Sequence, residues 1–202
     1  MGARDTHASF RGFAVIIRFF ASALYVAFAL TGAANAQQIE SSYTDLDLNL
    51  HCTVIQSDDF GSTWACPGLK GIPVMVSEGD LRMFVSYGLT STTEKAAEQT
   101  LGPFNRLGDK IEWRVSNAEG YWKPFATILR YFTQREGTET EGQVLVVTRV
   151  QPGATCQIAY VDALANPDAN ELARKTADER AKDFDCSKDE PEYVGKFEAW
   201  ER

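Results

Sequence analysis

Histidine is scarce in this 202-residue chain, which contains two. His7 lies in the first 36 residues, which leaves His51 as the single histidine of the remainder. A Ser-His-Asp or Cys-His triad would have to use His51, and zinc would have to share it with cysteines that we expect to be oxidised. The sequence also contains no Gly-x-Ser-x-Gly motif, no phosphate-binding loop and no Gly-x-Gly-x-x-Gly fingerprint. These absences argue against most nucleophilic, metal-dependent and nucleotide-dependent mechanisms, so we expect no such catalytic residues, no metal and no cofactor.

Apolar runs are also short, and the longest one lies near the N-terminus. Phe19 to Leu30 is apolar over 12 residues, shorter than the ~20 residues of a membrane-spanning helix. Arginines precede this run, and the small residues Ala34 and Ala36 follow it in the pattern that a signal peptidase accepts. We therefore predict a secretory signal over residues 1–36, cleaved near Ala36. Residues 37–202 are then one periplasmic or secreted domain without a membrane span.

Positive charge is in deficit, with 20 Lys and Arg against 28 Asp and Glu and a net charge of −8. Residues 1–36 carry three Arg and one Asp, so their removal leaves 17 basic and 27 acidic residues and a net charge of −10. Such a surface repels nucleic-acid phosphates and anionic lipids. We expect neither of these as a partner, which leaves an envelope protein or a glycan, and the sequence does not define the oligomeric state.

Four cysteines allow three pairings, and an exported chain favours disulfides over free thiols. Cys52 and Cys66 flank the turn-rich segment Asp58–Gly61, so a hairpin would place them opposite each other at a Cα separation that a disulfide spans. Cys156 then pairs with Cys186, which ties the segment after a helix to a strand. A redox pair is disfavoured because the sequence has no Cys-x-x-Cys.

The pattern of apolar residues predicts a mainly β chain. Tyr43–Leu50 alternates like a strand with one solvated face, and Val144–Val150 is apolar like a strand buried on both faces. Asn166 can cap, and Pro167 can begin, a long helix that continues to about Phe184. We therefore predict an α+β fold: an antiparallel, meander-like sheet of about eight strands with one long C-terminal helix packed on it and two disulfides.

Two other segments give weaker expectations. Thr92–Leu101 contains mostly good helix formers, which predicts a short helix before the stop at Gly102. The acidic tail, residues 187–202, also holds three aromatic residues, and we expect it to be loosely docked or disordered.

Four arginines interrupt strand-like apolar runs. If they shared one sheet face they would form a cationic patch, and nearby aromatic residues would suit an anionic or carbohydrate-like ligand. The alternative, which we favour, is that each arginine pairs with a neighbouring carboxylate on a solvated face. The candidate ligand-binding residues are Arg82, Arg114, Arg130, Arg149, Trp122 and Tyr131.

Among the acids, Asp162 stands out because it ends an apolar strand before the helix. We interpret it as a cap of the following loop rather than as a catalytic acid. Asp45, Asp47 and Asn49 match the opening of an EF-hand loop, but Leu50 occupies the position that requires glycine. A strand with inward-facing leucines explains this segment better than calcium.

Several segments, Glu78–Gly88, Ala126–Arg130 and Cys156–Cys186, resemble a group of small exported bacterial proteins that have no assigned function. The resemblance covers roughly Tyr43 to Cys186. It implies a cell-envelope setting and agrees with the two cysteine pairs, but it brings no catalytic residue and no substrate.

The function that these observations favour is a non-catalytic binding or interaction module of the cell envelope. One alternative is an inhibitor of a wall-degrading hydrolase such as lysozyme, because a stapled loop is preorganised for binding. The loops Asp58–Ser62 and Ser116–Lys123 are its candidates. The other alternative is a carboxylate-based glycan hydrolase, which needs only two acids at a suitable separation.

Overall fold

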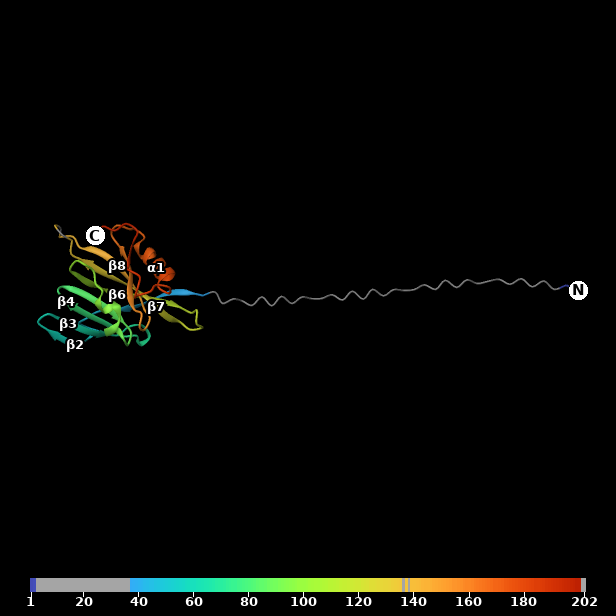
Figure 1. The fold of residues 1–202 in the computed structure, drawn as a ribbon, viewed down its shortest axis with the longest axis horizontal. Helices are drawn as coiled ribbons and strands as arrows, with labels where there is room; N and C mark the ends of the chain where they lie inside the picture. The colour runs from blue at the N-terminus through green and yellow to red at the C-terminus, as the bar shows by residue number, and fades with distance from the viewer. Residues whose placement is uncertain (3–36, 136, 138, 201–202) are drawn as a thin grey trace. The chain divides into compact units, whose positions relative to one another are not determined.

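The computed structural model describes residues 1–2, 37–135, 137 and 139–200. The chain divides into two units, residues 1–35 and 36–202, and all the strands and helices discussed below belong to the second unit (Figure 1). The signal sequence and the cleavage site that we predict lie outside the described residues. None of the helices in the described residues is long and apolar enough to cross a membrane.

A six-stranded sheet forms the centre of the domain, in the order β1-β6-β7-β8-β9-β10. Its neighbours are antiparallel except for β10, which runs parallel to β9. The strand β8, which we predicted to be buried on both faces, lies inside this sheet and is buried along most of its length. The bounds are β1 Ile39–Asp45, β6 Asn105–Ser116, β7 Lys123–Thr133, β8 Gly142–Arg149, β9 Cys156–Asp162 and β10 Glu192–Val194.

A second sheet of four antiparallel strands follows the order β2-β3-β4-β5. The prediction of one meander of about eight strands was therefore wrong: the strands form two sheets. The reason is that both faces of the central sheet are apolar, and a single meander would leave one face uncovered. The bounds are β2 Thr53–Asp58, β3 Gly61–Cys66, β4 Val74–Gly79 and β5 Arg82–Tyr87.

Two apolar cores lie on either side of the six-stranded sheet. Between the two sheets, Trp113, Tyr131 and Val76 belong to one cluster of buried side chains. On the other face, Ala126 and Val147 pack with alanines of the helix α1, Ala169–Arg180. The domain thus has three layers: a small sheet, a large sheet and a helix.

The helix α1 is shorter than the sequence suggested, with 12 residues, so the predicted long helix was wrong. Asp168 precedes it without a side-chain cap, and the expected cap, Asn166, instead donates its amide to the carbonyl oxygen of Lys196 at 2.7 Å. The segment around 92–101 forms two short 3-10 helices, η2 Ser91–Thr93 and η3 Lys95–Glu98, rather than an α-helix. A third 3-10 helix, η1, spans Leu69–Gly71.

The acidic tail, which we expected to dock loosely, contributes β10 and two buried side chains, Phe197 and Ala199. Tyr193 and Trp200 surround the Phe197 ring with edge-on contacts. The backbone N–H of Glu198 donates to the Asp162 carboxylate at 2.8 Å. The tail is therefore docked on the domain by its aromatic side chains, despite its acidic composition.

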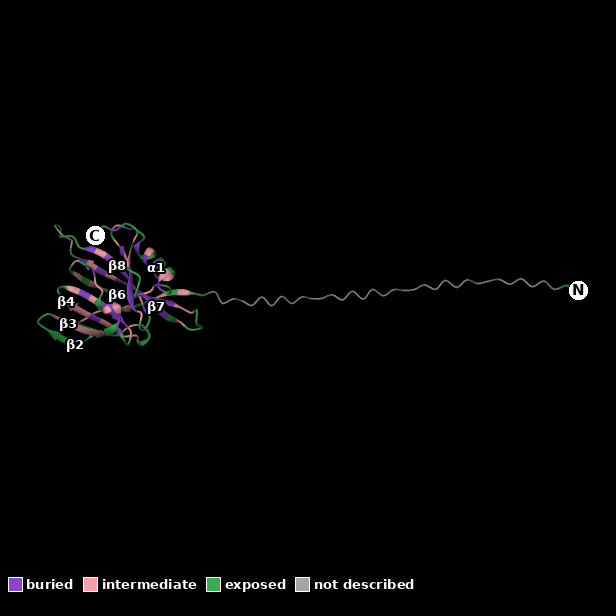
Figure 2. Cartoon of the chain, in the orientation of Figure 1, coloured by how far each residue is buried: buried purple, intermediate pink, exposed green. Residues whose placement is uncertain are grey.

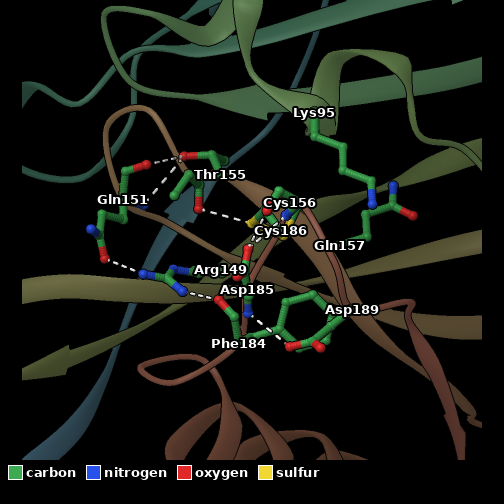
Figure 3. Close-up of a disulfide and its surroundings, with 12 residues drawn as sticks. Lys95, Arg149, Gln151, Thr155, Cys156, Gln157, Phe184, Asp185, Cys186 and Asp189 are labelled. Carbon is green, nitrogen blue, oxygen red and sulfur yellow. Dashed lines mark hydrogen bonds between the residues drawn. A yellow bond between two sulfur atoms is a disulfide. The ribbon is translucent and has the colours of Figure 1, made fainter.

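Both predicted disulfides are present. Cys52–Cys66 closes the β2–β3 hairpin with Cα atoms 4.2 Å apart, and Val54 faces Trp64 next to it as the hairpin reading required. Cys156 in β9 bonds Cys186, which follows α1, and this bond links the segment after the helix to the central sheet (Figure 3).

Candidate functional site

Three of the four candidate arginines lie on one face of the central sheet. The register places Ala126 opposite both Arg114 and Arg149, and Arg130 lies four residues further along β7, so all three share the face of Ala126. This face is the one that α1 covers. Hence the structure places these arginines against the helix layer, not on an open sheet surface.

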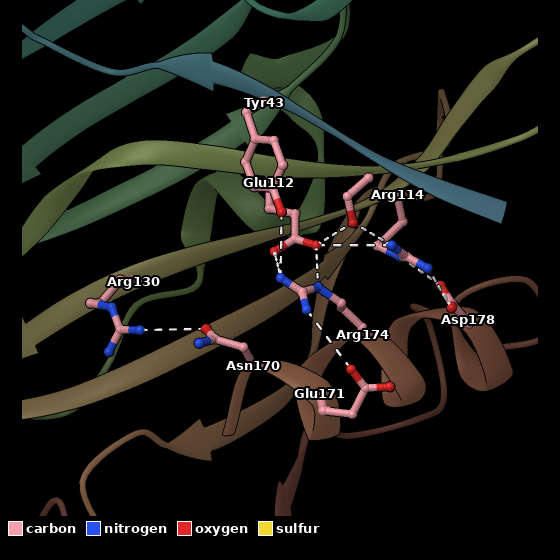
Figure 4. A network of polar contacts seen from close by, with 9 residues as sticks. Tyr43, Glu112, Arg114, Arg130, Asn170, Glu171, Arg174 and Asp178 are labelled. Atoms are coloured by element: carbon pink, nitrogen blue, oxygen red, sulfur yellow. Dashed lines mark hydrogen bonds and ion pairs between the residues drawn. The ribbon is translucent and has the colours of Figure 1, made fainter. Parts of the chain in front are cut away.

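Each of these arginines holds the helix layer to the sheet. Arg114 is buried and binds the Asp178 carboxylate of α1 with two hydrogen bonds of 2.8 and 2.6 Å (Figure 4). Arg149 donates to the carbonyl oxygen of Phe184. Arg130 donates to the side chains of Gln143 in β8 at 2.8 Å and of Asn170 in α1 at 3.5 Å, and burial lowers its pKa. Among the described residues, only Arg114 of these three pairs with a carboxylate, and it does so beneath α1 rather than on the solvated face that we favoured.

The neighbouring Glu112 of β6 completes this polar network. Its carboxylate accepts from Arg174 of α1 at 2.7 Å and from the hydroxyl of Ser41 in β1 (Figure 4). The hydrogen bond that Arg174 donates to Glu112 raises the pKa of Arg174 above its ordinary value. Charged side chains from β6 and α1 therefore neutralise one another at this edge of the sheet, and the Ser41 hydroxyl of β1 bonds to them.

The other three candidate residues lie apart from this face. Tyr131 is 1% exposed in the core between the sheets, and burial raises the pKa of its hydroxyl. Trp122 is half-buried, and its carbonyl oxygen accepts from Lys70 at 2.8 Å. Arg82 belongs to the small sheet, where it pairs with Asp80. The six residues are thus not brought together.

A different place in the fold has the form of a site, and we call it the loop end. Here the β2–β3 and β4–β5 turns meet the start of β6 and the loop after β7. A hollow of about 560 Å³ opens at this end. Its lining comprises Glu78, Leu81, Phe104, Asn105, Arg106, Phe132, Gln134, Arg135, Glu139, Thr140 and Glu141.

In the wall of the hollow, arginine side chains lie over the rings of phenylalanine side chains. The Arg106 guanidinium lies 3.9 Å from the centre of the Phe132 ring, and it binds Glu141 with hydrogen bonds of 3.0 and 2.6 Å. The bond from Arg106 lowers the pKa of the Glu141 carboxyl, and the same bond raises the pKa of Arg106. Arg82 stands over Phe104 in a similar way, at 5.2 Å.

The β4–β5 turn at the rim has an unusual backbone. Its two central residues, Asp80 and Leu81, have φ values of 52° and 59°, as in a type I′ turn. Asn, Asp and Gly accept this left-handed conformation, but a bulky residue such as leucine is an outlier there. Leu81 is nevertheless 62% exposed, so no packing in the core explains its presence.

Hydrogen bonds clamp this turn from both sides. The N–H of Leu81 donates to the Glu78 carboxylate at 3.0 Å, and its carbonyl oxygen accepts from the N–H of Asn105 at 3.0 Å. The Asn105 side chain accepts from the N–H of Met83, and Arg82 donates to the carbonyl oxygen of Gly102. The backbone that carries the exposed Leu81 side chain is therefore held in place.

The β2–β3 turn lies directly beside the β4–β5 turn. Gly61 pairs with Gly79, and a Cβ atom at Gly61 would lie 1.9 Å from the carbonyl oxygen of Glu78. Only glycine permits this approach, which brings the tip residue Phe60 close to the neighbouring turn. Phe60 is 87% exposed, and β2 is exposed along its whole length (Figure 2).

Phe60, Leu81 and Phe104 together form what we call the apolar rim of the loop end. Phe104 is 39% exposed, so all three side chains reach solvent. Of the two candidate loops from the sequence, Asp58–Ser62 lies at this end. Ser116–Lys123 does not, since it follows the opposite end of β6 from Asn105.

Sequence reasoning missed Arg106, Phe132 and the loop after β7, because β6–β7 pairing brings them together from distant positions. One local signal was available: a leucine in the second central position of the tight turn after Gly79. The Asp162 reading is confirmed, because its carboxylate accepts from the N–H groups of Leu164 and Ala165.

Comparison with known proteins found no matching family, no matching curated protein and no matching solved structure. The site is therefore interpreted from its own geometry and chemistry.

Proposed function

We propose that this chain is a non-catalytic binding module of the cell envelope that engages its partner through the apolar rim of the loop end. The observation that carries the proposal is the turn at Leu81. Its backbone stores strain, hydrogen bonds hold it rigid, and its side chain is directed to solvent. Strain of this kind persists where a function requires it.

The rim also has the properties of a binding surface. Leu81 and Phe104 line the hollow with aliphatic and aromatic carbon, and Phe60 lies on the adjacent turn, so a partner side chain can be desolvated there. The neighbouring hairpin is closed by Cys52–Cys66, so little conformational entropy is lost when it binds. Two disulfides support a location in an oxidising compartment, the periplasm or the exterior.

The exposed tip of the β2–β3 hairpin favours a second candidate function, inhibition of a wall-degrading hydrolase. Asp58, Asp59 and Phe60 could enter an enzyme cleft as a preformed wedge on the stapled hairpin. Mixing the purified protein with several lysozymes tests this candidate. Loss of lysozyme activity that Phe60→Ser abolishes would support it, and undiminished activity across the panel would remove it.

A site-specific crosslinker tests the main proposal. A photoreactive phenylalanine analogue at position 81 should capture an envelope component in cells, whereas the same analogue at position 89 should not. Leu89 is the matched control because it is 94% exposed and follows the opposite end of β5. Equal capture at both positions, or none at position 81, would contradict the proposal.

A further inference from the structure

The surroundings of the apolar rim are acidic. Three arginines lie at the loop end, and each has a partner: Arg82 pairs with Asp80, Arg106 with Glu141, and Arg135 donates to the carbonyl oxygen of Glu198. Acids outnumber these arginines two to one. They are Asp58, Asp59, Glu78, Asp80, Glu139 and Glu141.

Three polar side chains of the hollow, Asn105, Glu78 and Arg106, already have partners within the protein. The Asn105 amide donates to the carbonyl oxygen of Pro103 and accepts from Met83, while Glu78 accepts from Leu81. Arg106 binds Glu141 through two nitrogens. A glycan needs several hydrogen-bond partners for its hydroxyl groups, and these side chains have already committed part of their capacity to partners within the protein. The apolar rim instead presents the exposed apolar side chains of Phe60, Leu81 and Phe104.

From the exposed carbon and the surplus of carboxylates, we infer that the loop end binds a basic segment of another protein. This segment inserts an apolar side chain between Phe60, Leu81 and Phe104, and its Lys or Arg residues face Asp58 and Asp59. The inference rests on the proposed function and names the partner class for the same site. A second copy of this chain does not fit, because its net charge of −8 would be repelled.

The two parts of this interaction have separate signatures. The apolar anchor supplies most of the affinity, so its loss raises the dissociation rate. The charges accelerate association and are screened by salt. Binding should therefore depend on Leu81 at every ionic strength, and on Asp58 and Asp59 chiefly at low salt.

A displayed library of random linear peptides, selected on the full exported protein, supplies the probe. We expect enriched peptides to carry Leu, Phe or Ile flanked by Lys or Arg. For the best peptide, Leu81→Asp should weaken binding by about tenfold or more, and Leu89→Asp should leave it unchanged. Raising NaCl from about 50 mM to about 500 mM should weaken binding several-fold. Aspartate accepts the left-handed backbone at position 81, so the variant should fold.

A parallel arm uses purified, insoluble murein sacculi and the same two variants. Sedimentation with sacculi that Leu81→Asp abolishes, without any Leu81-dependent peptide, would assign a glycan; it would overturn this inference and leave the proposed function standing. Enriched peptides without basic residues would also overturn it. Binding equal in both variants would overturn it as well, and the crosslinks at position 81 then decide whether the proposed function survives.

Discussion

At position 81 the backbone conformation favours glycine, whereas the proposed binding needs the leucine side chain. The left-handed conformation at positions 80 and 81 suits the dipeptide Asp-Gly, the preferred sequence of a type I′ turn. Leu81→Gly should therefore relieve strain and stabilise the protein by about 1 kcal/mol, since the exposed leucine side chain has little buried area to lose. The same change should weaken binding of the selected peptide about tenfold or more.

Chemical denaturation and peptide titration of one Leu81→Gly sample give both quantities. A gain in stability with a loss in binding identifies Leu81 as a residue retained for function at a cost in stability. A loss in stability would mean instead that contacts of the leucine side chain support the fold. Leu89→Gly is the control for a change at an exposed leucine.

Glu94 is a buried acid with a structural task. Its carboxylate accepts from the Thr90 hydroxyl and from the N–H groups of Gly153 and Thr155, which ties the β8–β9 turn to the region of η3. Burial alone would raise the pKa of Glu94, but the hydrogen bonds from Thr90, Thr155 and Gly153 outweigh it, and the pKa lies below its ordinary value. The folded state therefore stabilises the ionised form of the Glu94 side chain over the protonated form.

This pKa shift makes stability dependent on pH. Because the folded-state pKa of Glu94 is lowered, its contribution is complete above the unfolded-state pKa of about 4.5 and is lost as the pH falls through the folded-state value. Glu94→Gln removes acceptor capacity and should cost about 1 to 3 kcal/mol at pH 7. Its stability should fall less steeply below pH 4.5 than that of the parent, as measured by urea denaturation. The exposed Glu98→Gln should reproduce the parent curve.

At the scale of elements, the helix α1 depends on charge as well as on apolar packing. Its buried stripe consists of small residues, Ala169, Ala173 and Ala177, and alanine side chains bury little area. Asp178 supplies a further attachment by pairing with the buried Arg114. Asp178→Ala should cost about 2 to 3 kcal/mol, because it leaves the guanidinium buried without its carboxylate.

The neighbouring Glu179 provides the control for this change, because it is exposed and lies on the same turn of α1. Glu179→Ala should alter the free energy of unfolding by less than about 0.5 kcal/mol. If both variants had the same stability, the Arg114–Asp178 pair would contribute nothing beyond a surface ion pair.

The elements themselves were largely readable from the sequence, whereas their arrangement was not. Alternation and apolar runs located strands such as β8 and β9, and the cysteine spacing located the β2–β3 hairpin. Periodicity does not say which strands pair, so the division into two sheets was missed. The helix predicted from 166 begins only at Ala169, because Asn166 bonds the C-terminal tail, a contact over 30 residues that no local pattern encodes.

For the whole molecule, the same limit applies to the site. The arginines chosen from the sequence do lie on one sheet face in three cases, but α1 covers that face. The loop end draws residues from four distant segments, and of these only the β2–β3 tip and Arg82 were candidates beforehand. Surface sites of this kind depend on which turns meet at one end of a sandwich, and therefore on the topology.

The two disulfides should act on different scales of the molecule. The chain-entropy model assigns each of them roughly 3 to 4 kcal/mol, slightly more for Cys156–Cys186 because it closes the longer loop, 30 residues against 14. Cys66 is buried, but Cys52 is only partly buried and β2 has no buried residue, whereas Cys156 and Cys186 both lie in the core beneath α1. Replacing Cys52 and Cys66 by serine should therefore loosen the hairpin locally: proteolysis should begin within residues 53–58, and peptide binding should weaken.

Replacing Cys156 and Cys186 by serine should lower the global free energy of unfolding and detach α1. Limited proteolysis and denaturation of the two double variants separate these outcomes, and unchanged peptide binding in the first would show that the rim does not need a rigid hairpin.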